Sequence, residues 1–392
     1  GMARVLDGRD GADHIREGVR LFSLVAADPQ TALDSTWVVL GLLWLRESGA
    51  TRASLQAVEA ARAETAVGAL PRLLFHLARD GATTDRWVSA ASEYLESIAL
   101  AEEFGHETDE ATSLAGLAWL EARQGLEEDC RRHAQRALTV AVPRHINIAC
   151  IWARFALGEL DLASGRMKEA VEGLIDLHAW LDAVGIRDVD VSPAPELVEA
   201  LMRTGREARA REVSQIHASR AHAKGQPWSL ARAARIEGIL APDTELDDVF
   251  GRALDLHALT PDLFESARTR LVFGTRLRRA RRRVHARAQL PQALATFERL
   301  GARPWAQTAA DELESTGETA ARLGVSGVDL LTPRERQIVM LLVAGRTTRA
   351  AAAALFLSPK TVECHLRHAY TKLAISSRSE LSLLVAASPE QQ

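Results

Sequence analysis

Up to about residue 318, apolar residues recur at the spacing of an α-helix, and short turns of Gly, Pro or Asp interrupt them. Residues 148 to 164 illustrate the pattern, with Ile151, Trp152, Phe155 and Leu162 interleaved with small Ala and Gly that let a neighbouring helix approach. Almost no stretch shows the two-residue alternation of a β-strand. The pattern predicts helix after helix and hence an all-α fold.

An internal repeat becomes visible when the turns are aligned. The segments RQGLEEDCRRHA, ASGRMKEAVEGL and RTGREARAREVS place Gly125, Gly165 and Gly205 at intervals of 40 residues. Each glycine follows a predicted amphipathic helix, can end it in the left-handed conformation, and precedes a helix with acidic residues in its first turn. A two-helix period near 40 indicates a tetratricopeptide-like (TPR-like) α-solenoid. We therefore predict that residues 3–318 form a sensor or interaction domain of this type.

Two features of the array allow alternative interpretations. Residues 276 to 287 carry seven arginines on a predicted helix, with Leu277, Ala280 and Val284 as its apolar seam. They could form a second nucleic-acid patch, but a solvated face paired with Asp and Glu is favoured. The tryptophans could line a ligand groove, but their even spread favours core positions between repeats. They stand at positions 37, 44, 87, 119, 152, 180, 228 and 305.

Capping signals divide the C-terminal part into four short helices. After a predicted linker at residues 319–330, Thr332 and Glu335 form a capping box with Pro333 at the first helical position, and Gly345 ends that helix. Thr347 and Ser358 can cap a second, alanine-rich helix and a third that runs to about Leu373. Residues 377–380 form another capping box. The short turn between the second and third helices predicts a helix-turn-helix within a domain spanning residues 331–388.

The third helix has two distinct faces on a helical wheel. Val362, Leu366, Ala369 and Leu373 fall within about 60° of one another, which predicts a buried seam. The opposite face carries Lys360, Cys364, Arg367 and Thr371, flanked by Glu363 and His368. In a helix-turn-helix, this outward face enters the major groove, so Lys360 and Arg367 are candidates for guanine edges or phosphates. Glu363 is either an acceptor for a cytosine amino group or a solvated residue.

The charge distribution agrees with a DNA-binding C-terminus. Residues 331 to 392 hold eight Arg and Lys against four Asp and Glu, a formal charge of +4, while the preceding residues carry −8. The widely spaced cysteines suggest neither a disulfide framework nor a zinc site, and no apolar run is long enough to span a membrane. We expect a cytoplasmic protein. No metalloprotease, serine-hydrolase or phosphate-loop motif occurs, so we predict neither catalysis nor a cofactor.

Residues 331 to 381 resemble the LuxR-type DNA-binding domain nearly end to end. The shared motifs are LTPRE, the AG turn, LSPKTV followed by a histidine three positions on, the Y-x-KL ending and SRSEL. The resemblance implies that the third helix reads the major groove through Glu363, Cys364 and Arg367. It also implies that the fourth helix mediates dimerisation through Ser377, Leu381 and Leu384. We further expect Thr361, His365 and Lys372, with Thr348 and Arg349 of the second helix, to contact DNA.

Two departures from the resembled proteins affect this interpretation. Where the family usually has a glutamate and a large aliphatic residue in the second helix, this chain has Ala350 and Ala351, which predicts a less stable or repacked domain. Upstream, residues 86–125 and 260–318 resemble the large ATP-binding LuxR-like regulators related to MalT. Their N-terminal STAND ATPase motif is missing here. Either the sequence is part of a larger protein, or it is a shorter relative, which Met2 as the natural start would favour.

These observations predict a sequence-specific transcription regulator that binds double-stranded DNA as a homodimer. RNA polymerase is a candidate partner, and a small-molecule or protein effector is expected on the helical repeats. The alternative is a TPR-like interaction adaptor with a weakened DNA-binding domain, to which Ala350 and Ala351 lend weight. Lys360, Arg367 and Lys372 argue against that alternative.

Overall fold

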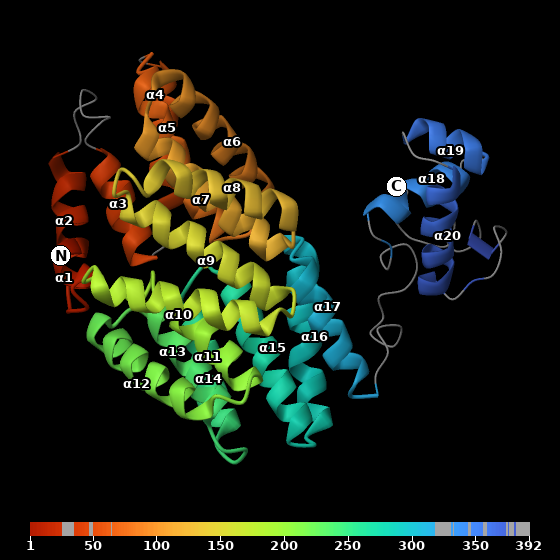
Figure 1. The fold of residues 1–392 in the computed structure, drawn as a ribbon. Helices are drawn as coiled ribbons and strands as arrows, with labels where there is room; N and C mark the ends of the chain where they lie inside the picture. Colours follow the sequence, from red (N-terminus) through yellow and green to blue (C-terminus); the bar gives the residue numbers. More distant parts are fainter. Residues whose placement is uncertain are drawn as a thin grey trace. The chain divides into compact units, whose positions relative to one another are not determined.

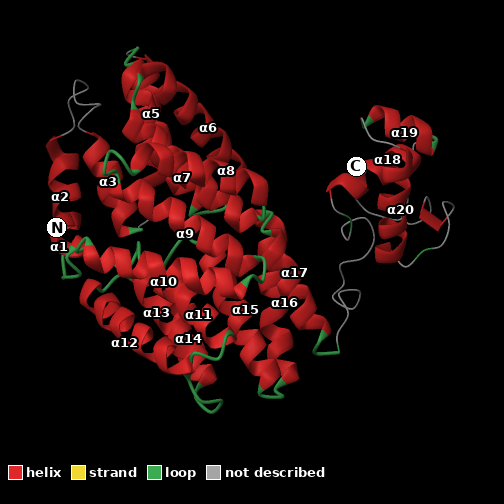
Figure 2. Ribbon diagram, in the orientation of Figure 1, coloured by secondary structure: helices red, strands yellow, loops and turns green. Residues whose placement is uncertain are grey.

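A computed structural model describes residues 1–25, 35–46, 50–63, 65–317, 331, 333–343, 346–355, 359–373, 375 and 380–381, some of them by their backbone alone. These residues form helices and no strands, which confirms the all-α prediction (Figure 2). None of the described helices is long and apolar enough to cross a membrane. The chain divides into unit 1, residues 1–316, and unit 2, residues 317–392.

Unit 1 is a succession of helices that Figure 1 labels in chain order. They are α1 (Met2–Leu6), α2 (Ala12–Val25), α3 (Ser35–Leu45), α4 (Ala50–Ala63), η2 (Val67–Ala69), α5 (Leu70–Ala82), α6 (Trp87–Phe104), α7 (Glu107–Gln124), α8 (Glu127–Ala141), α9 (Asn147–Ala163), α10 (Met167–Ala183), α11 (Ala194–Arg203), α12 (Glu207–Lys224), α13 (Pro227–Leu240), α14 (Leu246–His257), α15 (Leu263–Arg279), α16 (Arg283–Leu300) and α17 (Arg303–Glu314). Unit 2 contains α18 (Pro333–Val343), α19 (Thr348–Ala354) and α20 (Pro359–Leu373).

The 40-residue repeat lies in the turns between these helices. Gly125, Gly165 and Gly205 have φ of 75°, 77° and 74°, the left-handed conformation predicted for them. A second series, offset by 20 residues, has the same conformation at positions 105, 145, 185 and 225, so each period contains two helices. The sequence pattern missed this series because His145 stands where the other three positions have glycine.

Inner and outer helices alternate along the repeat. The helices α5, α7, α9, α11, α13 and α15 are buried on most sides, whereas the outer helices between them bury one stripe each. In α8, for example, the stripe consists of Cys130, Ala134, Ala137 and Ala141. Small residues at helical spacing allow adjacent helices to pack closely. Figure 1 shows the helices of unit 1 stacked as successive hairpins.

Contacts between distant segments close unit 1 on itself. Trp87 and Phe264 pack with their ring centroids 5.6 Å apart, although they come from α6 and α15. At the N-terminal end, the backbone N–H of Arg187 donates to the carbonyl of Leu6 at 2.7 Å. The Trp44 Nε1 donates to Asp188 at 3.0 Å. The first helices therefore lie against the segment that follows α10.

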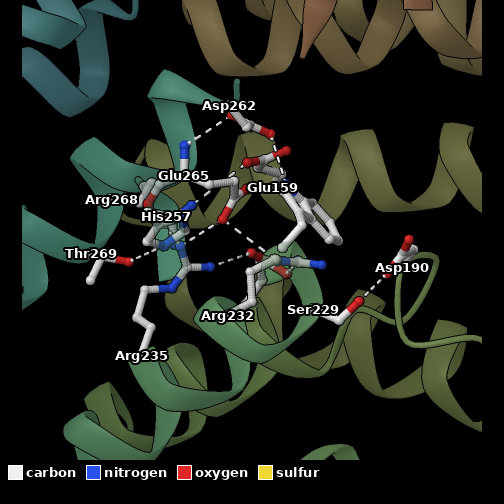
Figure 3. A network of polar contacts seen from close by, with 12 residues as sticks. Glu159, Asp190, Ser229, Arg232, Arg235, His257, Asp262, Glu265, Arg268 and Thr269 are labelled. Carbon is white, nitrogen blue, oxygen red and sulfur yellow. Dashed lines mark hydrogen bonds and ion pairs between the residues drawn. The ribbon is translucent and has the colours of Figure 1, made fainter. Parts of the chain in front are cut away.

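A network of buried ion pairs crosses the interior (Figure 3). Glu265 of α15 accepts from Arg123 at 2.9 Å and from Arg235 at 2.6 Å. Arg232 donates to Glu196 at 2.9 Å, and Arg268 to Glu199 at 2.6 Å. Four arginines and four glutamates, counting Glu159, take part. Since buried charges need partners, these ion pairs join the inner helices α7, α9, α11, α13 and α15 to one another.

The arginine-rich segment is not the single helix that we predicted. α15 ends at Arg279, Arg281 adopts φ of 61°, and α16 begins at Arg283. This turn shifts the helical phase, so Leu277 is buried while Val284, expected on the same seam, is 75% exposed. Four of its arginines bind within unit 1, to Ala241 and Asp243, Glu312, Asp247 and Thr316. These contacts support the paired face over a second nucleic-acid patch.

The tryptophans with described side chains lie in the core or line a groove, except Trp180, which is half-buried against Leu177 and Leu181. Trp87, Trp119, Trp228 and Trp305 are buried, as the core interpretation predicted. Trp44 and Trp152 are half-buried and line a groove of about 1110 Å³. The side chain of Trp37 lies outside the described part of the chain.

Candidate nucleic-acid interface

The helices of unit 2 begin and end where local signals predicted. α18 and α20 have Pro333 and Pro359 at their first positions. The Thr347 Oγ1 accepts from the backbone N–H of Ala350 at 3.1 Å, which caps α19 as expected. The N–H of Arg346 donates to the carbonyl of Leu341 at 3.0 Å, a bond that closes the C-terminal turn of α18. Thr332, Gly345 and Ser358 lie outside the described residues.

Two apolar clusters hold the three helices together. The first contains residues from all three, namely Ile338, Leu342, Ala351, Ala352 and Val362. The second contains Leu331, Val339, Ala369, Leu373 and Leu381. Because both clusters include residues of α20, they set the orientation of this helix about its own axis.

The orientation of α20 matches the wheel derived from the sequence. Val362, Ala369 and Leu373 are buried, and Leu366 packs half-buried against the first cluster. The described side chains of the other face, those of Lys360, Glu363 and Arg367, are exposed. The predicted buried seam is therefore confirmed, and α20 presents a face with two cations and one carboxylate.

The other predicted contact residues have different positions. Arg349 is exposed on α19, and Thr348 is half-buried beside it. His365 is half-buried on α20. Only the backbone is described for Thr361, Cys364, His368, Thr371 and Lys372, all within α20.

One of the predicted dimerisation residues needs correction. Leu381 is fully buried in the second apolar cluster, beside Val339, Ala369 and Leu373. An apolar side chain in the core of its own domain is not available to a second chain, so Leu381 stabilises the domain itself. Ser377 and Leu384 lie outside the described residues.

Ala351 occupies the position at which the family usually has a large aliphatic residue, and where we expected a less stable or repacked domain. Its side chain is fully buried between Ile338 and Leu342 of α18 and Val362 of α20. The small side chain thus lies in a closed contact between helices. Ala350 is half-buried, and its N–H makes the capping bond with Thr347.

Comparison with known proteins identifies the same segment. Residues 329–385 match the family model described as "Bacterial regulatory proteins, luxR family". The spore germination protein GerE of Bacillus subtilis is 47% identical over 51 residues, which are 13% of this chain and 69% of GerE. An HTH-type transcriptional regulator of Aeromonas salmonicida is 45% identical over 76 residues, 19% of this chain and 38% of that protein.

A longer relative is matched over a smaller share of its length. An HTH-type transcriptional regulator of Mycobacterium bovis is 36% identical over 85 residues, which are 20% of this chain and 10% of that protein. The chain thus spans a tenth of the length of this mycobacterial protein. The matched region in GerE, by contrast, is most of the protein.

Proposed function

Because this chain belongs to the LuxR family of bacterial DNA-binding transcription regulators, we propose that it reads specific duplex sequences through α20. The observation that carries the proposal is the exposed face of α20, with Lys360 and Arg367 opposite a fully packed seam. A helix held in this way can place its exposed side chains in the major groove while its buried side chains keep their contacts in the core of unit 2. The +4 charge of residues 331–392 supplies attraction to phosphates.

The DNA-bound species is proposed to be a homodimer. One short recognition helix reaches too few base pairs for useful specificity, and a two-fold dimer doubles the number. Since Leu381 is part of the core, the dimer contact in this proposal uses other residues of the segment from Ser377 to Leu384. A regulator that acts on the chromosome works in the cytoplasm, with RNA polymerase as a candidate partner. The proposal assigns no catalytic step to the chain.

Unit 1 is proposed to be the sensing part, which binds an effector and thereby alters DNA binding. Its closed superhelix, with a groove of about 1110 Å³, offers a preformed concave site. Because neighbouring repeats of an α-solenoid stabilise one another, binding at one repeat can change the stability of the next.

Gel-shift and fluorescence-anisotropy titrations of the full chain with the DNA upstream of its own reading frame test the DNA-binding proposal. We expect a saturable complex containing two chains that competitor DNA of random sequence does not displace at equal concentration. Equal affinity for the upstream fragment and for random DNA would instead favour the interaction adaptor. A complex with one chain per site would remove the dimer from the proposal.

A further inference from the structure

The groove of unit 1 contains a buried guanidinium without an acidic partner. Arg79 of α5 is 8% exposed, and its guanidinium carbon lies 4.1 Å from the ring centre of Trp119 and 4.6 Å from that of Trp152. Among the residues that the structure describes, no carboxylate forms an ion pair with it. Burial, and next to it the charge of Arg46, lower the pKa of Arg79 to about 9. A buried cation in this environment is stabilised by an added anion.

Arg79 lines a small hollow with a surplus of positive charge. The hollow has a volume of about 20 Å³ and is bordered by four guanidinium groups, those of Arg46, Arg79, Arg123 and Arg232. Two carboxylates, Asp190 and Glu265, also border it. Asp190 is paired with Lys224 at 2.6 Å, and Glu265 with Arg235 at 2.6 Å and Arg123 at 2.9 Å. Since Arg232 is paired with Glu196 at 2.9 Å, the surplus comes from Arg46 and Arg79, which form no ion pair among the described residues.

One guanidinium nitrogen at this hollow also lacks a partner. The Nη1 of Arg123 is buried and has no hydrogen-bond acceptor among the described residues. Buried N–H groups are rarely left without an acceptor. The hollow is wide enough for the oxygens of one small anionic group.

The groove of about 1110 Å³ adjoins this hollow, since Arg46, Arg79 and Trp152 line both. Part of its wall is apolar and aromatic, with Trp44, Leu73, Phe75, Ile151 and Trp152. The groove is therefore suited to an apolar body, with a charged group at the end where Arg79 lies.

Each of the four carboxylates of the groove lies beside a cation, but two of them share a single lysine. Asp109 lies 3.3 Å from Arg72, and Glu107 is bound by Arg144. Asp188 and Asp190 share Lys224, at 2.7 and 2.6 Å. Arg46, like Arg79, forms no ion pair with a carboxylate within the described ranges, although its charge, after that of Lys224, lowers the pKa of Asp190. Arg46 and Arg79 carry two positive charges, against the one negative charge that Asp188 and Asp190 leave after sharing Lys224, so the net charge of the groove is positive.

We propose that this groove binds a small organic carboxylate, with its apolar body against Trp44 and Trp152 and its carboxylate against Arg79 and Arg46. The size of the hollow favours a carboxylate over a bulkier acidic group. The depth of Arg79 favours a small molecule, since only a narrow terminal group reaches it. This ligand class would be the effector of the proposed sensing role. The binding itself can be tested whether or not unit 1 acts as a sensor.

Calorimetry on the full chain with 1-naphthaleneacetate and 1-naphthaleneacetamide tests the inference, because the two probes differ in charge and hardly in shape. We expect the acid to bind about ten-fold more tightly than the amide. Arg79→Met keeps a long side chain between the two tryptophans and should abolish the difference. The control is Arg154→Met, which removes a guanidinium 4.8 Å from the ring of Trp180, away from the groove, and should preserve it.

The unfolding temperature distinguishes a ligand-binding role of Arg79 from a purely structural one. Without ligand, Arg79→Met should unfold at the same temperature as the parent chain or higher, because it removes an uncompensated buried charge. A clear fall in the unfolding temperature, equal binding of both probes, or no binding of the acid at millimolar concentration would each overturn the inference. None of these results bears on DNA binding in the gel shift, so the proposed regulator function is tested separately.

Discussion

At the scale of single residues, the two kinds of cation on α20 have different uses. The guanidinium of Arg367 can donate two parallel N–H groups to the O6 and N7 of a guanine, which an ammonium group does not do with the same geometry. Arg367 is on the exposed face of α20, whereas Lys372 lies about 140° from it on an ideal helical wheel. The two residues should therefore contribute differently to specificity.

Alanine substitutions at these positions should separate base reading from phosphate binding. Arg367→Ala should weaken binding to the cognate site by about 1 to 3 kcal/mol and relax the preference at one base pair. Lys372→Ala should weaken all sequences about equally and reduce the salt dependence by about one phosphate. Titrations of the cognate site, its single-base variants and random DNA at two salt concentrations distinguish these results. If Arg367→Ala lowers cognate and random binding by the same factor, Arg367 is a phosphate contact.

Buried histidines make unit 1 sensitive to acid. Burial lowers the pKa of His76 to about 4, and those of His217 and His257 to about 3, from 6.5. Below pH 6.5 the unfolded chain therefore binds protons that the folded chain does not. Their contribution to stability is present above pH 6.5 and is lost as the pH falls toward the folded values.

Urea unfolding between pH 7.5 and 5.5 measures this loss. Each histidine should contribute roughly 1 kcal/mol per pH unit below 6.5. The glutamine of His257→Gln can still form a hydrogen bond with the Thr269 hydroxyl. This variant should lose less unfolding free energy per pH unit than the parent chain, by the contribution of one histidine. The same change at the exposed His222 is the control. An unchanged slope for His257→Gln would show that this side chain takes up a proton equally in both states.

The sequence allowed us to predict residue roles only where the pattern within a single helix determines them. The buried seam of α20 follows from 3.6-residue periodicity, because its apolar side must meet α18 and α19. Glu159, Glu265 and Arg79 are charged residues on helices buried on most sides, and their partners come from other repeats. No local pattern indicates which charge another repeat supplies, so the ion network and the groove were missed.

At the scale of elements, α19 shows what the two alanines do. Ala351 fills a contact between α18 and α20, and Ala350 stands three positions after the capping Thr347. We expect Ala351→Ile to destabilise unit 2 by about 1 to 3 kcal/mol through overpacking. Ala350→Glu should stabilise it by about 0.5 to 1 kcal/mol by completing the capping box. Thermal unfolding of the parent chain and the two variants tests whether Ala351→Ile lowers and Ala350→Glu raises the stability of unit 2. A more stable Ala351→Ile chain would indicate unfilled space beside Ala351.

Element boundaries followed from the sequence where a capping residue, proline or glycine marks them. Pro333, Pro359 and Gly125 are examples. The turn at Arg281 has no such marker, since an arginine adopts the left-handed conformation there. Its neighbours Arg276 and Arg282 are held by Asp243 and Asp247, contacts that only the folded unit provides. The continuous helix expected over 276–287 was wrong for this reason.

At the scale of the whole molecule, the order of the parts could be predicted but the closure of unit 1 could not. Composition and charge separate an acidic helical body from a basic end, and the repeat spacing indicates stacked hairpins. The bond from Arg187 to Leu6 and the contact between Trp87 and Phe264 join segments some 180 residues apart. Such contacts depend on the accumulated curvature of many repeats.

The uneven charge of the molecule should make its DNA binding strongly dependent on salt concentration. Residues 331–392 carry +4 and the preceding residues −8, so attraction to DNA comes from a small part of the chain, and the body opposes it. Displacement of phosphate counterions then dominates the affinity, and log K should fall linearly with log salt at a slope of about −0.9 per phosphate contact. With about four contacts per chain, and so about eight in the proposed dimer, a fourfold rise in salt weakens binding of the dimer by a factor on the order of 10,000. Anisotropy titrations of the full chain at 50 and 200 mM salt measure this ratio. Micromolar binding that stays the same at both concentrations would mean that non-ionic contacts hold the complex.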